Sequence, residues 1–116
     1  MKLERIVTEL GLRAVAAPAE AAALEIARGY ASDLLSDVLA HAPEGGVLVT
    51  LQVHLNVVAV ASHAGLPAVI FTSGRTPEDE VVARAAEEGL ALYATDDDTF
   101  EVVGRLYALG LKGCHA

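Results

Sequence analysis

The chain has 116 residues, of which 53% are hydrophobic, and this combination predicts one folded domain with a buried core. The same apolar content excludes a disordered chain. The formal net charge of −8 argues against nucleic acid and anionic membrane surfaces as partners, because both would repel the chain.

The N-terminal quarter predicts a helix followed by a strand. Apolar residues recur at helical spacing and a glycine follows them: Leu3, Ile6, Val7, Leu10 and Gly11. Residues 12–17 form a short apolar run that ends at Pro18, which is typical of a strand. Residues 19–28 are ambiguous, because their alanines favour a helix whereas Leu24 and Ile26 alternate as in a strand. We expect a loop there, and then a short strand that leads to Gly29.

From Ser32 onward the pattern alternates between helices and strands. Ser32 or Asp33 is expected to cap a helix with the apolar stripe Leu34, Leu35, Val38 and Leu39. Three apolar runs are typical of strands buried on both faces: residues 47–51, 68–71 and 90–94. A helix that is apolar almost all round is predicted over residues 55–64.

Two more helices complete the predicted pattern. One begins at Thr76 as its N-cap, with Pro77 in the first turn and the acidic Asp79 three residues after the cap. An ion pair between Glu80 and Arg84 is expected on its outer face. We expect four of its residues to point inward: Val81, Val82, Ala85 and Ala86. The last helix is capped by Thr95 or by one of Asp96, Asp97 and Asp98, and it carries Phe100, Val103, Leu106 and Tyr107.

This alternation implies strand–helix–strand crossovers, and therefore a mainly parallel sheet between layers of helices. We expect an α/β fold, a three-layer α/β/α arrangement, with residues 1–116 forming a single domain. Residues 45–74 contain no Asp, Glu, Lys or Arg, but a membrane helix there would place polar residues such as Gln52, His54 and Asn56 in lipid. A buried strand, helix and strand explain the stretch without that cost, so we expect no membrane association.

In a parallel sheet, ligands bind where the carboxyl ends of the strands meet the N-termini of helices. Polar loops are expected to gather there and to line a shared cleft. The candidate ligand-binding residues are Ser32, Asp33, Gln52, His54, Asn56, Thr72, Ser73, Arg75 and Thr95. The loop 72–76 offers backbone N–H groups and a guanidinium to an anion. Against this, Glu78, Asp79 and Glu80 would repel phosphate, and helix capping explains Ser32, Asp33, Thr76, Thr95 and Asp98 equally well.

No residue pattern predicts catalysis, a metal site or a cofactor. Ser32, His54 and Asp33 supply the residue types of a nucleophilic triad, but no G-x-S-x-G motif supports one. His54 and His63 lie too far apart to share one helix face as metal ligands, and the run 96–98 is expected to be a solvated cap. The single cysteine, Cys114, and the charged first eight residues lead us to expect a cytoplasmic protein.

Three segments together resemble a known family: GYASDLLSDV at residues 29–38, TLQVHLNVVAVA at residues 50–61, and residues 95–107. The chain resembles a stand-alone DRTGG-domain protein, and it is similar to the N-terminal domain of HPr kinase/phosphorylase. The resemblance implies an α/β/α domain that accompanies catalytic domains, acts in regulation or assembly, and often self-associates. The literal Asp-Arg-Thr-Gly-Gly is absent, and residues 27–30 read Ala-Arg-Gly-Tyr at the corresponding place.

Our first hypothesis is a regulatory, ligand-sensing or assembly module without catalytic activity of its own, which binds a small molecule or a partner protein. The alternative is a small enzyme that acts on a small anionic or nucleotide-like substrate at the sheet edge. A homodimer is expected in either case, because the helix 55–64 offers more apolar surface than one sheet covers. Cover from neighbouring helices and from residues 19–23 is the competing explanation for that surface.

Overall fold

The computed structural model describes residues 1–114 and contains a five-stranded sheet with helices on both faces. The strands are β1 (Arg13–Ala16), β2 (Gly29–Ala31), β3 (Val47–Thr50), β4 (Ala68–Phe71) and β5 (Ala91–Ala94). The helices are α1 (Leu3–Leu10), the short 3₁₀ helix η1 (Ala21–Ala23), α2 (Leu35–His41), α3 (Asn56–Ala64), α4 (Asp79–Glu88) and α5 (Thr99–Leu109).

The sheet has the strand order β1-β5-β4-β3-β2, and all its pairs are parallel except the pair of β1 with β5. Each step from β2 to β5 moves one strand across the sheet by way of one helix, as crossover connections require. The carboxyl ends of these four parallel strands therefore reach the same edge. The mainly parallel three-layer fold predicted from the sequence is confirmed.

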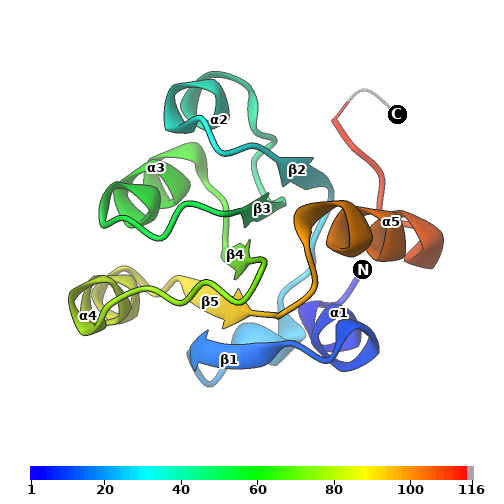
Figure 1. Ribbon diagram of the computed structural model, residues 1–116, viewed down its shortest axis with the longest axis horizontal. Helices are drawn as coiled ribbons and strands as arrows, with labels where there is room; N and C mark the ends of the chain where they lie inside the picture. The colour runs from blue at the N-terminus through cyan, green and yellow to red at the C-terminus, as the bar shows by residue number, and fades with distance from the viewer. Residues whose placement is uncertain (115–116) are drawn as a thin grey trace.

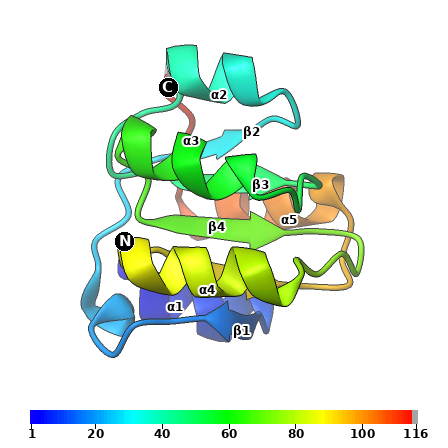
Figure 2. The ribbon, with the colours of Figure 1, turned by 90° about the vertical axis from the view of Figure 1, so that its left-hand side faces the viewer.

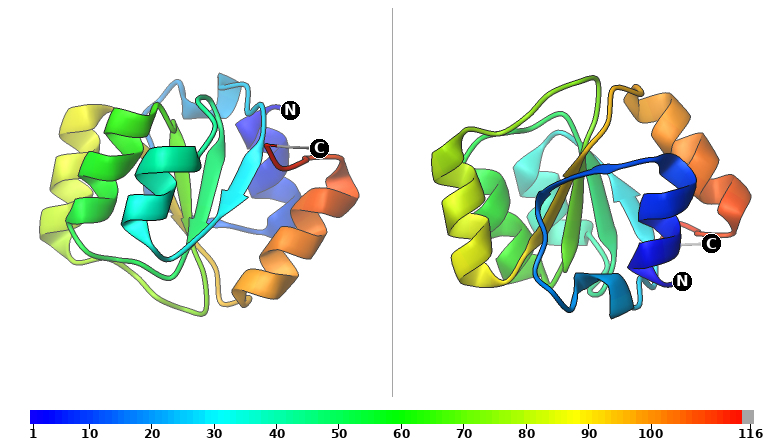
Figure 3. Two further views of the ribbon diagram at one scale, coloured as in Figure 1. Left: turned by 90° about the horizontal axis from the view of Figure 1, so that it is seen from above. Right: turned by 90° about the horizontal axis from the view of Figure 1, so that it is seen from below.

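The helices form two layers (Figure 1). Helices α2, α3 and α4 lie side by side over one face of the sheet, which Figure 2 shows from that side, and α1 and α5 cover the other face (Figure 3). Side chains of successive strand residues point to opposite faces, so each strand supplies both layers. In β3, for example, Leu48 packs toward α2–α4, whereas Val47 and Val49 pack toward α1 and α5.

The three predicted buried strands are β3, β4 and β5, and all their residues are buried. The short strand expected before Gly29 begins at that glycine instead, as β2, and residues 21–23 form the 3₁₀ helix. Strand pairing explains the shift, because residues 29–31 form a strand by pairing with β3, and this pairing places Tyr30 opposite Leu48. No helix among residues 1–114 is both long and apolar enough to cross a membrane.

Several predicted helix details are wrong. Helix α2 has no side-chain cap, and Leu34 and Leu39 of its expected apolar stripe are 65% and 49% exposed. Helix α4 begins at Asp79 rather than near Thr76, again without a side-chain cap, and its Ala86 is exposed. Arg84 contacts Glu87, at 3.8 Å, instead of Glu80. The last helix follows the prediction, since the Asp98 side chain accepts a hydrogen bond from the Glu101 N–H at 2.8 Å.

Helix α3 does not leave an open apolar face. It lies between α2 and α4, and Val57, Val58 and Ala61 are fully buried against them and the sheet. Its exposed residues are small or polar: Asn56, Ala59, Ser62 and His63. The expectation that this helix needs a second copy for cover is therefore wrong, and neighbouring helices, the competing explanation, provide it.

Candidate functional site

The polar loops do gather at the carboxyl edge of the parallel strands. Residues 32–33 follow β2, residues 51–54 follow β3, residues 72–75 follow β4 and residues 95–97 follow β5. Backbone hydrogen bonds continue from the sheet into this edge, from Thr72 N–H to the Thr50 carbonyl at 3.2 Å and from Thr95 N–H to the Phe71 carbonyl at 3.0 Å. Eight of the nine candidate residues lie in these four loops, and the ninth, Asn56, is the first residue of α3 beside them; we call these residues the rim.

Asp33 holds two loops of this rim together. Its Oδ1 accepts hydrogen bonds from the Thr50 hydroxyl at 3.0 Å and from the Leu51 N–H at 2.7 Å. In return, Gln52 Nε2 donates to the Asp33 carbonyl at 3.1 Å. Asp33 is therefore not the cap of α2, as the sequence suggested, but a brace between the β2–α2 and β3–α3 loops.

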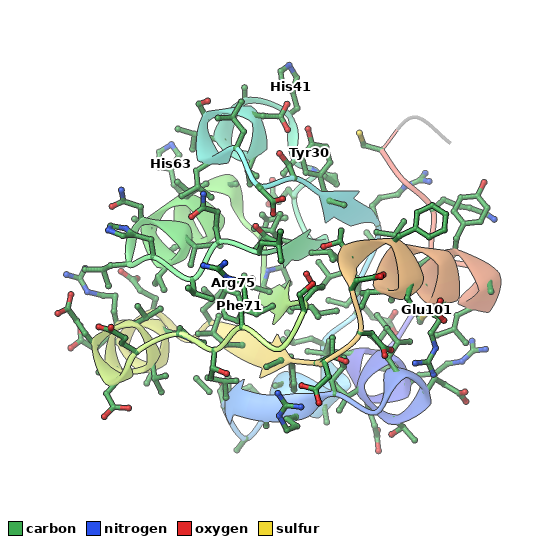
Figure 4. The ribbon with its side chains drawn as sticks, viewed as in Figure 1. Tyr30, His41, His63, Phe71, Arg75 and Glu101 are labelled. Atoms are coloured by element: carbon green, nitrogen blue, oxygen red, sulfur yellow. The ribbon has the colours of Figure 1, made fainter. Side chains whose placement is uncertain are left out.

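A groove of about 410 Å³ opens beside this brace, between the N-terminal ends of α3 and α4. It is lined by Gln52, Val53, His54, Leu55, Arg75, Glu78, Glu80 and Val81. Arg75 lies at the end of the loop after β4 (Figure 4) and forms no ion pair within the part of the chain that the structure describes. The groove thus combines a guanidinium, an imidazole, an amide and two carboxylates with three aliphatic side chains.

Only three of the nine candidate residues line this groove, namely Gln52, His54 and Arg75. Thr72 and Thr95 are buried, so their side chains serve the protein interior. Ser32, Asp33, Asn56 and Ser73 belong to the same rim without lining the groove. Sequence reasoning considered Glu78 and Glu80 only as groups that repel phosphate and did not count them among the residues that line the groove, although their place at the start of a helix at this edge was a usable signal.

The loop after β4 is not a cradle of free N–H groups. The N–H of Ser73 donates to the Asp97 carbonyl at 2.8 Å, that of Gly74 to the Thr95 carbonyl at 2.9 Å, and that of Arg75 to the Thr72 carbonyl at 3.2 Å. Ser73 and Gly74 have φ angles of 59° and 72°, which Gly74 adopts without strain and which are uncommon for a serine. Residues 73 and 74 are therefore fastened to the β5–α5 connection, and among residues 72–75 only Arg75 lines the groove.

The three residues that could form a nucleophilic triad, Ser32, His54 and Asp33, do not contact one another in this way, because each forms hydrogen bonds to other groups. Ser32 Oγ accepts a hydrogen bond from the Leu34 N–H at 3.2 Å, and His54 Nδ1 accepts one from the Asn56 N–H at 3.2 Å. Asp33 is bound to Thr50 and Leu51. This arrangement organises loops and helix starts and does not aim an activated hydroxyl into the groove.

The acidic run after β5 is explained residue by residue. Asp96 contacts Arg13 at 3.4 Å, Asp97 contacts Arg105 at 3.0 Å, and Asp98 caps α5. Within residues 1–114 no three His, Cys, Asp or Glu side chains are grouped closely enough to hold a metal ion.

A second polar cluster lies behind the rim, between β2 and α2. The Tyr30 hydroxyl donates to Asp37 Oδ2 at 2.7 Å, and His41 Nδ1 lies 3.2 Å from Asp37 Oδ1 (Figure 4). The hydrogen bond from Tyr30 lowers the pKa of Asp37 below its usual value, with Ser32 and His41 acting in the same direction. The same bond, together with burial and the negative charge of Asp37, raises the pKa of Tyr30 to about 12.

This pair predicts a loss of stability in alkali. Because the folded pKa of Tyr30 is raised, its contribution is complete below the unfolded value of about 10 and is lost as the pH rises toward about 12. Asp37 has the opposite sign, so its contribution is lost only in acid, as the pH falls through its lowered pKa. Tyrosinate absorbance should show a tyrosine titrating near pH 12, and in Asp37→Asn that titration should move toward its ordinary value. An unchanged titration curve in Asp37→Asn would contradict the assignment.

Comparison with known proteins agrees with this architecture. Residues 32–109 match the model of the DRTGG domain, which is well over half of the chain. The structure superposes, with a TM-score of 0.76 and 17% sequence identity, on the CBS and DRTGG domains of the regulatory region of Clostridium perfringens pyrophosphatase. That structure is a complex with an activator, diadenosine tetraphosphate.

The superposition covers 90% of this chain but only 45% of the pyrophosphatase chain, and at this identity it establishes the fold. No curated protein sequence matches the chain. The match to the family model spans the rim loops, the groove and helices α2 to α5. The resemblance noted from the sequence is thereby confirmed, and this chain belongs to the DRTGG domain family.

Proposed function

We propose that this chain is a regulatory, ligand-sensing domain without catalytic activity of its own. Its ligand is a small anionic or nucleotide-like molecule that binds in the groove between α3 and α4. The observation that carries the proposal is Arg75, an exposed guanidinium on the wall of a groove of about 410 Å³ with no ion pair within residues 1–114. An arginine in this position offers a planar set of donors to one phosphate or carboxylate.

The remaining groove residues limit what the ligand carries. Glu78 and Glu80 line the same groove as Arg75, so a dense row of phosphates would meet repulsion there. Carboxylates and the Gln52 amide are suitable partners for amino and hydroxyl groups, and Val53, Leu55 and Val81 supply apolar lining. A ligand with one anionic end and a polar, partly apolar body, such as a nucleoside monophosphate, fits this distribution. The activator bound to the pyrophosphatase region contains two adenosine units, and this nucleoside part supports the choice, whereas its row of four phosphates is not what this groove favours.

The experiment is a calorimetric titration with AMP, ATP and diadenosine tetraphosphate. We expect Arg75→Ala to weaken binding of the preferred nucleotide about tenfold or more, because a hydrogen-bonded charge contributes about 1.5–3 kcal/mol. The matched control is Arg84→Ala, which removes an exposed arginine that pairs with Glu87 on α4 outside the groove. Equal binding by both variants, or no heat with any of the three nucleotides, would contradict the proposed ligand class.

The alternative, a small enzyme at the same edge, makes a separate prediction. It requires turnover of the bound nucleotide, which chromatography of the incubated mixture would detect. The engagement of Ser32 and His54 by backbone groups favours the non-catalytic reading. We further propose that residues 1–116 act as one domain, in the cytoplasm, and as a homodimer.

A further inference from the structure

Helix α5 presents an uncovered apolar stripe to solvent. Phe100 is 89% exposed, Tyr107 is 54% exposed and Val103 is 37% exposed, whereas Val102 and Leu106 turn inward to the sheet. The helix lies at the outside of its layer, next to α1 and β2 (Figure 3). An exposed aliphatic and aromatic row of this kind marks an interaction surface more often than a scatter of single residues does.

The spacing of the stripe is that of a helix-packing seam. Phe100, Val103, Gly104 and Tyr107 stand at positions i, i+3, i+4 and i+7, so they lie on one face of the helix. None of them is charged. Gly104 is at the centre, exposed, and has no neighbour within 4 Å of the place where a Cβ would be, so a second helix can approach the backbone closely there.

A hollow lies beside one end of the stripe. An apolar cavity of about 220 Å³ opens between α5 and β2, with Tyr30, Val103, Tyr107 and Leu111 in its wall. Lys112 Nζ lies 3.6 Å from the centre of the Tyr107 ring, so a positive charge marks this end of the helix. The other end carries Phe100 as a protruding side chain, and the acidic Asp98 and Glu101 stand near it.

We propose that the occupant of this face is a second copy of the chain, packed through an antiparallel pair of α5 helices on a two-fold axis near Gly104. In such a pair Phe100 of each copy lies opposite Tyr107 and the hollow of the other. Phe100 and Tyr107 are about 10 Å apart along the axis, which places both contacts symmetrically about Gly104. A two-fold interface needs this self-complementarity, because the same patch faces itself.

Charge gives a second reason for the antiparallel arrangement. It sets Lys112 of each copy against the end of α5 that carries Asp98 and Glu101 in the other. A parallel pair would oppose like charges at both ends. Since the whole chain carries a net charge of −8, two copies associate best through the uncharged stripe that ends in this complementary pairing. This interface is the contact surface of the homodimer proposed above, and it rests on that part of the proposed function. It does not involve the groove between α3 and α4.

The first test measures mass by light scattering on a sizing column at micromolar concentration. We expect a dimer for the wild type, and a dimer dissociation constant raised about 30-fold or more in Phe100→Glu, because an aromatic anchor is replaced by a charge in both halves of the interface. Leu39→Glu, at a residue of α2 that is 49% exposed, is the matched control and should remain dimeric. A monomeric wild type, or a dimer that survives Phe100→Glu, would overturn the proposal.

The second test locates the axis. In a Cys114→Ser background, Gly104→Cys should form a disulfide-linked dimer under mild oxidation, because the two copies of residue 104 face each other. Ser62→Cys, on the exposed side of α3, should not. Equal cross-linking of both variants would contradict the interface. Titration of Phe100→Glu with the nucleotides separates the two proposals, since the groove should still bind when the dimer is lost.

Discussion

Replacing Phe71 with alanine should lower the free energy of unfolding by about 3–5 kcal/mol. Phe71 is the last residue of β4, is fully buried, and belongs to the core between the sheet and helices α2, α3 and α4. It is paired in register with Thr50 of β3 and Ala94 of β5, so its neighbours are held by the sheet and cannot collapse into the space left by the ring. The cavity would therefore remain.

Denaturant unfolding followed by circular dichroism measures this loss. Domains of this kind are stable by about 5–15 kcal/mol, so the variant should lose a large share of its stability. Leu34→Ala, at a residue that is 65% exposed, is the control and should change the free energy of unfolding by no more than about 0.5 kcal/mol. A loss below about 1 kcal/mol in Phe71→Ala would show that this core is less tightly packed than the structure has it.

The strands of the core were predictable because their sequences leave no alternative. Residues 47–50, 68–71 and 91–94 are continuous apolar runs apart from Thr50, and a strand buried on both faces needs such a run. The parallel arrangement followed from the helices between them. The antiparallel edge strand β1 was predicted as a strand but without its partner, since a run of four residues does not record which neighbour it joins.

The helix surfaces were less predictable, because an apolar residue on a helix does not say which neighbour covers it. Val57 and Val58 of α3 are covered by α2, α4 and the sheet, whereas Phe100 and Tyr107 of α5 remain 89% and 54% exposed. The sequences of α3 and α5 are both rich in apolar residues. What separates them is their place in the layer: α3 is central and α5 is lateral (Figure 1), and strand order decides that.

The position of the candidate site followed from the topology, but its lining did not. The rule that ligands bind at the carboxyl edge of parallel strands pointed to the edge where the polar loops gather, and ligand binding there stays a prediction. Which rim residues face a groove depends on contacts between loops, and sequence spacing does not record these. Thr72, for example, turns inward and lies 2.7 Å from the Thr99 hydroxyl, whereas Arg75, three residues later, reaches the groove.

Asp33 is the rim residue whose removal should have the largest effect on stability. Asp33→Ala should lower the free energy of unfolding by about 1–3 kcal/mol. The substitution deletes the acceptor of the Leu51 N–H and leaves the hydroxyl of the fully buried Thr50 without its acceptor. The lower half of the range is the better expectation if water reaches the Leu51 N–H, which lies at an exposed position.

Asp33→Asn is the matched variant that separates geometry from charge. A single oxygen, Oδ1, accepts both hydrogen bonds, and an asparagine presents one carbonyl oxygen in the same place, so most of the stability should be retained. Because the brace also fixes the loop that carries Gln52, nucleotide binding in the groove should weaken in Asp33→Ala and persist in Asp33→Asn. Denaturant unfolding and calorimetric titration of the same two proteins measure both effects. If alanine is tolerated as well as asparagine, Asp33 does not brace the rim, and the groove is held by the strands alone.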